Sequence, residues 1–158
     1  MSFAAVLTAT AFAAPARADD WETCAKGAGD EAIAACTRAI KSGTYNGKTL
    51  ALAYSNRGVE WRAKGDLARA IADYDEAIKA DPQQSAAYNN RGEAYRKRQE
   101  LERAVADFDH AIKSDPGYAP ALANRGIMRV DKREFDGAIA DLSEAIKLNR
   151  NDAVLFNN

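Results

Sequence analysis

Residues 56–79 read NRGVEWRAKGDLARAIADYDEAIK, and closely similar stretches begin at residues 90 and 124. Each stretch opens with Asn-Arg-Gly and closes with Ala-Ile-Lys, and successive starts are 34 residues apart. Within each stretch, apolar and small residues recur at steps of three and four, which predicts two amphipathic helices. One such pair cannot bury both of its faces, so neighbouring pairs must stack. The sequence therefore predicts an all-α array of stacked helix pairs.

The repeat resembles the tetratricopeptide repeat family, which has a 34-residue period. Full repeats are expected at residues 51–84, 85–118 and 119–152. The positions that carry the resemblance are the small residues Gly58, Gly92 and Gly126 and, later in each repeat, Tyr74, Phe108 and Leu142. The resemblance implies an α-solenoid of antiparallel helix pairs that forms a right-handed superhelix, with the first helix of each pair lining a concave groove.

Turn residues fall between the expected helices. Lys64-Gly65-Asp66 separates the two helices of the first repeat, with glycine at the end of the first helix. Pro82 and Pro116 are expected in the first turn of the helix that follows each of them, where the missing N–H costs nothing.

The resemblance also implies which residues line the groove. They are Asn56, Asn90, Asn124, Ser55, Asn89, Val59, Glu93, Ile127, Arg62, Arg96 and Lys97. The asparagines at residues 56, 90 and 124 hold one position in each repeat, where an amide would donate to and accept from a ligand backbone. The alternative is that these amides bond neighbouring helices. The basic residues at 62, 96 and 97 are either a patch for an acidic ligand or solvated surface charge.

Some family members clamp a C-terminal carboxylate with lysines beside the conserved asparagine. The matching positions here are Ser55, Asn89 and Ala123, together with Leu52, Ala86 and Pro120. Because none of these is a lysine, binding of a chaperone tail by that clamp is disfavoured.

Arginine and aspartate recur with the same period at two further positions. The arginines are Arg57, Arg91 and Arg125, and the aspartates are Asp73, Asp107 and Asp141. An arginine buried without a carboxylate would be costly. We therefore expect each arginine to pair with an aspartate on a second helix of its own or an adjacent repeat, in a structural role.

The first 18 residues are typical of an export signal. An apolar run too short to span a bilayer ends in Ala16-Arg17-Ala18, a small-x-small cleavage pattern. The alternative is an alanine-rich tail. The signal predicts a periplasmic or secreted protein, as in an exported bacterial member of the family, and an oxidising compartment favours a disulfide between Cys24 and Cys36 over two buried thiols.

The two flanks depart from the regular repeat. Residues 19–50 are expected to form a degenerate helix pair, cross-linked by the two cysteines, that caps the array. Residues 153–158 match the start of a fourth repeat that is not completed. Either the chain continues into a longer protein, in which it is an accessory segment to a catalytic or other domain, or a partner covers the last repeat, including a second copy of the chain.

The composition and the remaining motifs argue against other functions. Lys and Arg (22) nearly balance Asp and Glu (23) among 158 residues, so no basic field favours nucleic acid or a membrane surface. Stable membrane insertion is not expected after signal removal. The single histidine, His110, and the two cysteines cannot make a zinc site, and no catalytic motif or cofactor motif stands in its required context. We expect a non-enzymatic scaffold, without cofactor or metal, that binds a protein or peptide.

Overall fold

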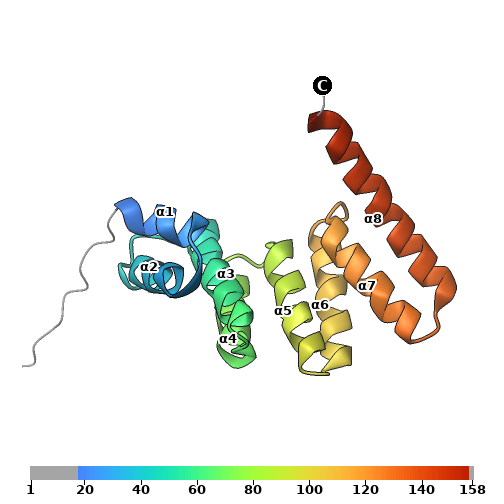
Figure 1. Ribbon diagram of the computed structural model, residues 1–158, viewed down its shortest axis with the longest axis horizontal. Coiled ribbons are helices and arrows are strands. Elements are labelled where there is room, and N and C mark those ends of the chain that lie inside the picture. Colours follow the sequence, from blue (N-terminus) through green and yellow to red (C-terminus); the bar gives the residue numbers. More distant parts are fainter. Residues whose placement is uncertain (1–17, 157–158) are drawn as a thin grey trace, which may run out of the picture.

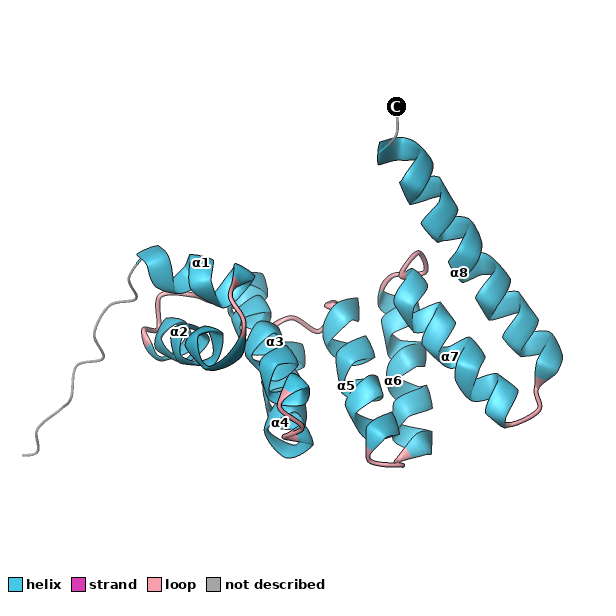
Figure 2. Ribbon diagram, viewed as in Figure 1, coloured by secondary structure: helices cyan, strands magenta, loops and turns pink. Residues whose placement is uncertain are grey.

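The computed structural model describes residues 18–156, which form eight helices and no strand (Figure 1). The helices are α1 (Ala18–Lys26), α2 (Gly29–Lys41), α3 (Gly47–Ala63), α4 (Leu67–Ala80), α5 (Ser85–Lys97), α6 (Leu101–Ser114), α7 (Ala119–Asp131) and α8 (Phe135–Phe156). Short loops join them throughout (Figure 2). The all-α architecture predicted from the sequence is confirmed.

Consecutive helices pack as pairs, and the pairs stack in chain order. The partners are α1 with α2, α3 with α4, α5 with α6 and α7 with α8. The leading helices α3, α5 and α7 also touch one another in sequence, whereas the described second helices α4, α6 and α8 do not. Leading helices therefore lie on the inner side of the array, where successive pairs come closest together. Figure 1 shows the pairs following one another from α1 to α8.

A glycine on each leading helix allows a ring or leucine from the second helix to approach its backbone. A Cβ placed on Gly58 would lie 2.7 Å from a ring carbon of Tyr74, and one on Gly92 would lie 2.7 Å from Phe108. The third repeat has the same contact between Gly126 and Leu142, at 2.8 Å. Only a residue without a Cβ fits at this position, which explains why the glycine recurs with the repeat.

The largest buried cluster spans repeat boundaries. It contains Tyr74 of the first repeat, Tyr95 and Phe108 of the second and Met128 of the third. Because apolar burial is shared between neighbours, no single helix pair holds a complete core.

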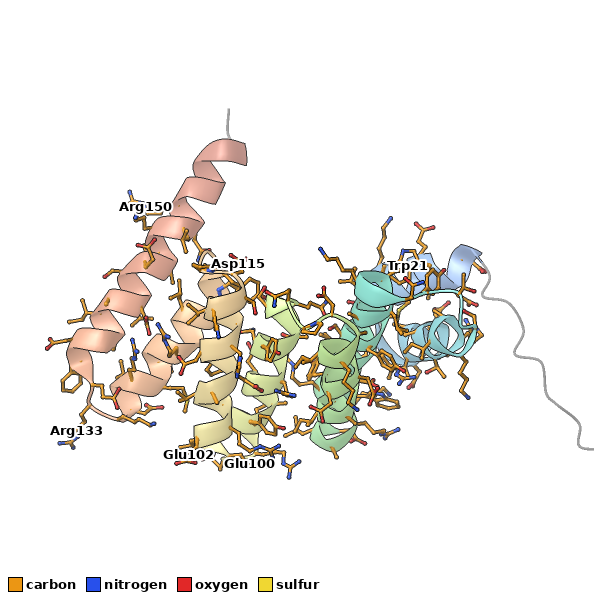
Figure 3. The ribbon with its side chains drawn as sticks, turned by 180° about the vertical axis from the view of Figure 1, so that it is seen from behind. Trp21, Glu100, Glu102, Asp115, Arg133 and Arg150 are labelled. Carbon is orange, nitrogen blue, oxygen red and sulfur yellow. A yellow bond between two sulfur atoms is a disulfide. The ribbon has the colours of Figure 1, made fainter. Side chains whose placement is uncertain are left out.

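The N-terminal pair is closed by a disulfide between Cys24 and Cys36, as the sequence predicts. Both cysteines are buried with Ala35 of α2 and Ala53 of α3, and Trp21 packs against this cluster (Figure 3). Cys36 aligns with the ring position of the later repeats, so the cross-link stands where a large side chain would otherwise fill the core.

Polar contacts fasten this pair to the first full repeat. The N–H of Gly29, at the start of α2, donates to the carboxylate of Glu60 on α3 at 2.6 Å. Lys64 pairs with Asp30 at 2.7 Å. The residue before α2 is Ala28, which provides no side-chain cap, so a carboxylate from the neighbouring pair takes that role.

The two predicted helix-start prolines lie in turns, contrary to expectation. Pro82 precedes the first residue of α5 by three positions, and Pro116 precedes α7 likewise. The N–H of Gln84 donates to the carbonyl of Asp81, and that of Tyr118 to Asp115, which places each proline second in a four-residue turn. The fixed φ of proline suits that position as well as a helix start.

The last helix runs past the repeat boundary expected at residue 152. α8 continues to Phe156 without a break, whereas α4 and α6 end at Ala80 and Ser114. The earlier second helices are each followed by Asp-Pro, and proline disfavours helical backbone in the residue before it. Asn149-Arg150 stands in place of that pair, so no residue there interrupts the helix.

Replacing Gly92 with alanine is expected to lower the free energy of unfolding by about 1–3 kcal/mol, because the added methyl overlaps Phe108. Helix propensity alone would predict a gain of about 1 kcal/mol, so the sign separates the two effects. Urea denaturation followed by circular dichroism measures the change. The control is Gly137→Ala, whose Cβ would meet only the movable Arg129 side chain. Equal or greater stability of Gly92→Ala would contradict the packing argument.

Replacing Tyr74 with phenylalanine is expected to raise the free energy of unfolding at pH 7 by about 1 kcal/mol. The Tyr74 hydroxyl is buried without a hydrogen-bond partner, and Phe108 holds the same position in the next repeat. Burial raises the pKa of Tyr74 to about 12. Between pH 10 and 12 the unfolded chain therefore loses a proton that the native state keeps, and stability falls as pH rises. The variant should lack that part of the alkaline loss in urea titrations at pH 9–12; an unchanged slope would contradict it.

Candidate ligand-binding surface

The leading helices present a continuous surface on the inner side of the array. We call it the leading-helix surface. It consists of Leu52, Asn56 and Val59 of α3, Asn90, Arg96 and Lys97 of α5, and Asn124, Ile127 and Val130 of α7. Three of its apolar members are well exposed, since Leu52, Ile127 and Val130 have exposed fractions of 44%, 46% and 44%. The surface therefore offers apolar contact beside amide and cationic groups.

The three asparagines do not behave alike. Asn124 donates to the side-chain oxygen of Asn89 at 2.9 Å and to Glu93 at 3.2 Å, so it bonds the preceding leading helix. Within residues 19–150, the amides of Asn56 and Asn90 make no hydrogen bond and are partly exposed. Val59 stands where Glu93 stands one repeat later, so Asn90 has no carboxylate to meet. Two of the three amides remain open to a ligand.

Ser55 and Asn89, expected to face a ligand, are instead buried, with exposed fractions of 5% and 3%. Ser55 donates to the side-chain oxygen of Gln84 at 3.0 Å, and Asn89 accepts from Asn124. Both lie at the contact between successive leading helices, which come too close together there to leave the side chain in solvent. These two residues hold repeats together and do not belong to the surface.

Arg62 and Glu93 form an ion pair across the α3–α5 boundary. Their side chains are 22% and 24% exposed, and Glu93 also accepts from Asn124. The pair neutralises both charges, so Arg62 does not contribute to the basic patch that the sequence suggests.

Arg96 and Lys97 remain as the cations of the surface. Neither forms an ion pair within residues 19–150, and the Nε atom of Arg96 is buried without a hydrogen-bond partner. The predicted patch of three basic residues thus reduces to two adjacent unpaired ones.

The periodic arginines lie behind this surface, and each joins the helices of two repeats. Arg91 donates from Nε and Nη2 to Asp107 of its own repeat at 2.8 and 2.7 Å. It also donates from Nη1 to Asp75 of the preceding repeat at 2.6 Å. The hydrogen bonds to Asp107 raise the pKa of Arg91 above its ordinary value. Arg57 and Arg125 make the same two-point contact with Asp73 and Asp141.

The carboxylates of the preceding repeat were missed in the sequence, although Asp75 and Asp109 are 34 residues apart. Asp109 binds Arg125 at 2.7 Å, as Asp75 binds Arg91. At the N-terminal end, Thr37 of α2 takes this place and accepts from Arg57 at 3.0 Å.

The third repeat exchanges an aromatic–arginine contact for an ion pair. Arg69 lies 3.6 Å from the ring centre of Trp61, and Arg103 lies 4.0 Å from that of Tyr95. The matching residues of the third repeat are Arg129 and a glycine, and Arg129 donates to Asp141 at 2.7 Å. The cation moves from the second helix to the first, which keeps this outer contact polar.

A pocket on the outer side, between α4, α5 and α6, is a weaker candidate. Its walls include Tyr88, which stacks on His110 with ring centres 5.2 Å apart. Its arginines, Arg91 and Arg103, are paired with carboxylates. The pocket therefore has aromatic walls but no unpaired charge with which to orient a ligand.

Two further searches found no other site. Among residues 19–150, no group of three or more His, Cys, Asp or Glu side chains is placed to hold a metal ion. No helix of the described chain combines the length and apolar character needed to cross a bilayer.

Comparison with known proteins places this architecture. A family model described as Tetratricopeptide repeat matches residues 57–119. The second TPR of Spaghetti (RPAP3), solved bound to HSP90 peptide SRMEEVD, is 33% identical with a TM-score of 0.60; the match covers 64% of this chain and 94% of that one. The first TPR of Spaghetti, bound to the same peptide, is 25% identical with a TM-score of 0.63, covering 69% and 86%.

MamA shares the fold at 22% identity and a TM-score of 0.67, with coverage of 78% of this chain and 70% of that one. No curated protein matches the sequence. The identity to a Spaghetti domain over nearly its whole length, the matching family model and the stacked helix pairs agree with one another. The chain belongs to the tetratricopeptide repeat family.

Proposed function

We propose that this protein is a non-catalytic scaffold that binds a segment of another protein, or a peptide, on the leading-helix surface. The observation that carries the proposal is the pair of open amides, Asn56 and Asn90, beside exposed Leu52, Ile127 and Val130. An amide that donates and accepts can bond a peptide backbone whatever its side chains, and the apolar residues add contact area. The two Spaghetti domains, solved with a bound peptide, support this use of the fold.

The proposal does not extend to the peptide found in those complexes. The positions at which the family's clamp has lysines are Ser55, Asn89 and Ala123 here, and two of them are buried between helices. A different ligand chemistry is therefore expected on this surface.

A peptide library displayed on phage and selected on the immobilised protein tests the function. Enriched peptides should bind the double variant Asn56→Ala/Asn90→Ala about ten- to a hundredfold more weakly, because two hydrogen bonds to the ligand backbone are lost. The matched control is Glu102→Ala/Lys113→Ala, which changes two exposed residues of α6, away from the surface. Affinities come from fluorescence polarisation. Failure to enrich any peptide, or equal affinity for the double variant, would contradict the proposal.

The end of the array offers a second contact, and its proposed occupant is another copy of the chain. Phe135, Ile139 and Ile146 on α8 are 57%, 64% and 59% exposed, whereas Ile71, which matches Ile139 two repeats earlier, is only 8% exposed. Two α8 helices packed antiparallel would cover these residues mutually. That arrangement also sets acidic Asp136 near the basic end of the partner helix, where Arg150 projects into solvent (Figure 3).

Sedimentation velocity at several concentrations tests this association. The protein should sediment as a dimer at about 100 μM, since burial of several apolar side chains supports at least micromolar affinity. The variant Ile139→Ser/Ile146→Ser should be monomeric, while Leu52→Ser, a control on the leading-helix surface, should remain dimeric. A monomeric wild-type protein throughout that range would rule out the self-association.

Export to the periplasm or the exterior is part of the same proposal. It is supported by the small-x-small pattern ending at Ala18 and by the disulfide between two buried cysteines, which is typical of an oxidising compartment. The proposed signal itself, apart from its last residue, lies outside the described residues.

A further inference from the structure

The three leading helices are related by the repeat, so a contact at one boundary predicts the contact at the next. At the first boundary, Arg62 of α3 meets Glu93 of α5. Adding 34 to both numbers gives Arg96 of α5 and Ile127 of α7. The second boundary therefore keeps the arginine and replaces its carboxylate with an aliphatic side chain.

The result is a cation without a partner in a partly buried place. The Nε atom of Arg96 is buried and accepted by nothing, and no ion pair involves Arg96 or its neighbour Lys97 within residues 19–150. The nearby acidic groups do not compensate it: Glu93 is engaged by Arg62 and Asn124, and Asp131 at the end of α7 forms no ion pair. A buried guanidinium donor left unpaired lowers stability, so an arriving carboxylate gains what the fold lacks.

Apolar side chains flank this cation. Ile127 and Val130 are three residues apart on α7, which puts them on one helical face, and they are 46% and 44% exposed. Aliphatic groups exposed next to an unpaired guanidinium suit a ligand that has both kinds of group close together.

The geometry points to a carboxylate subsite at Arg96 and Lys97, bordered by Ile127 and Val130, that selects a peptide segment in which Asp or Glu stands next to a branched aliphatic residue. This inference rests on the proposed function, since it names the ligand class of the same surface. The carboxylate accepts hydrogen bonds from the guanidinium, and the aliphatic side chain packs on α7. Charge complementarity with the unpaired arginine identifies the occupant.

The test uses fluorescein-labelled octapeptides with a Gly-Ser background and one of four central pairs: Glu-Ile, Gln-Ile, Glu-Ser or Lys-Ile. Fluorescence polarisation should show that the full-length protein binds the Glu-Ile peptide at least tenfold more tightly than the Gln-Ile peptide. Arg96→Gln should reduce that ratio to about one. The Glu-Ser peptide should bind several-fold more weakly than Glu-Ile.

A second variant separates loss of the subsite from loss of the fold. Ile127→Glu restores the carboxylate found at the first boundary, so it should pair with Arg96, retain or raise the thermal midpoint and abolish the preference for Glu over Gln. Lys113→Gln on α6, an exposed change of the same charge, is the control and should keep the preference.

The outcomes distinguish the subsite from the general function. Saturable binding of all peptides with equal affinity, dependent on Asn56 and Asn90, would overturn the subsite and leave the scaffold function standing. Preservation of the Glu preference in Arg96→Gln or Ile127→Glu would overturn it as well. Absence of saturable binding for every peptide up to about 1 mM would overturn both.

Discussion

The two-sided grip of the periodic arginines is the interaction on which the array depends. A guanidinium is planar and presents its donors in a fixed fork, so a bidentate bond to one carboxylate and a further bond to another fix two directions at once. Arg91 binds Asp107 within its repeat and Asp75 in the repeat before, and thereby ties α5 to both α6 and α4. Asp107 is only 4% exposed, and a carboxylate so buried is tolerated because its cation is supplied. Because the grip recurs at each boundary, each pair is set on the last in a similar way.

Within such a regular frame, the departures from the repeat indicate where the molecule does something besides stack. Glu93 and Ile127 hold the same position in successive repeats, yet the first neutralises an arginine and the second leaves one unpaired. The exchange of an aromatic residue for Arg129 has the opposite character, because a new ion pair with Asp141 compensates it inside the fold. Compensated changes maintain structure, whereas an uncompensated charge on an exposed apolar surface is what a binding site requires.

The sequence predicted features set by period, because every repeat votes for them. The helix pairs, the glycine contact with Tyr74 and the arginine–aspartate bonds all follow from residues that recur at one interval. Features set by distances between helices were not predictable in this way. The burial of Ser55 and Asn89 depends on how closely leading helices approach, and the course of α8 depends on the absence of a single proline. The role of Asp75 was readable in principle, since it recurs at Asp109, but its partner lies in the next repeat.

The two ends of the array are chemically unequal, and this inequality limits how copies can associate. A head-to-tail contact would join the α8 face of one copy to the N-terminal face of the next and would propagate without closing. The N-terminal face is already occupied, because the cross-linked pair of α1 and α2 packs on α3 and is fastened by Glu60 and Lys64. The exposed apolar residues lie at the other end, on α8. Only a contact between like ends then buries apolar surface on both sides, and such a two-fold contact closes on itself. The disulfide-linked cap thus does more than stabilise the first repeat: it directs association towards a finite dimer and away from a growing filament.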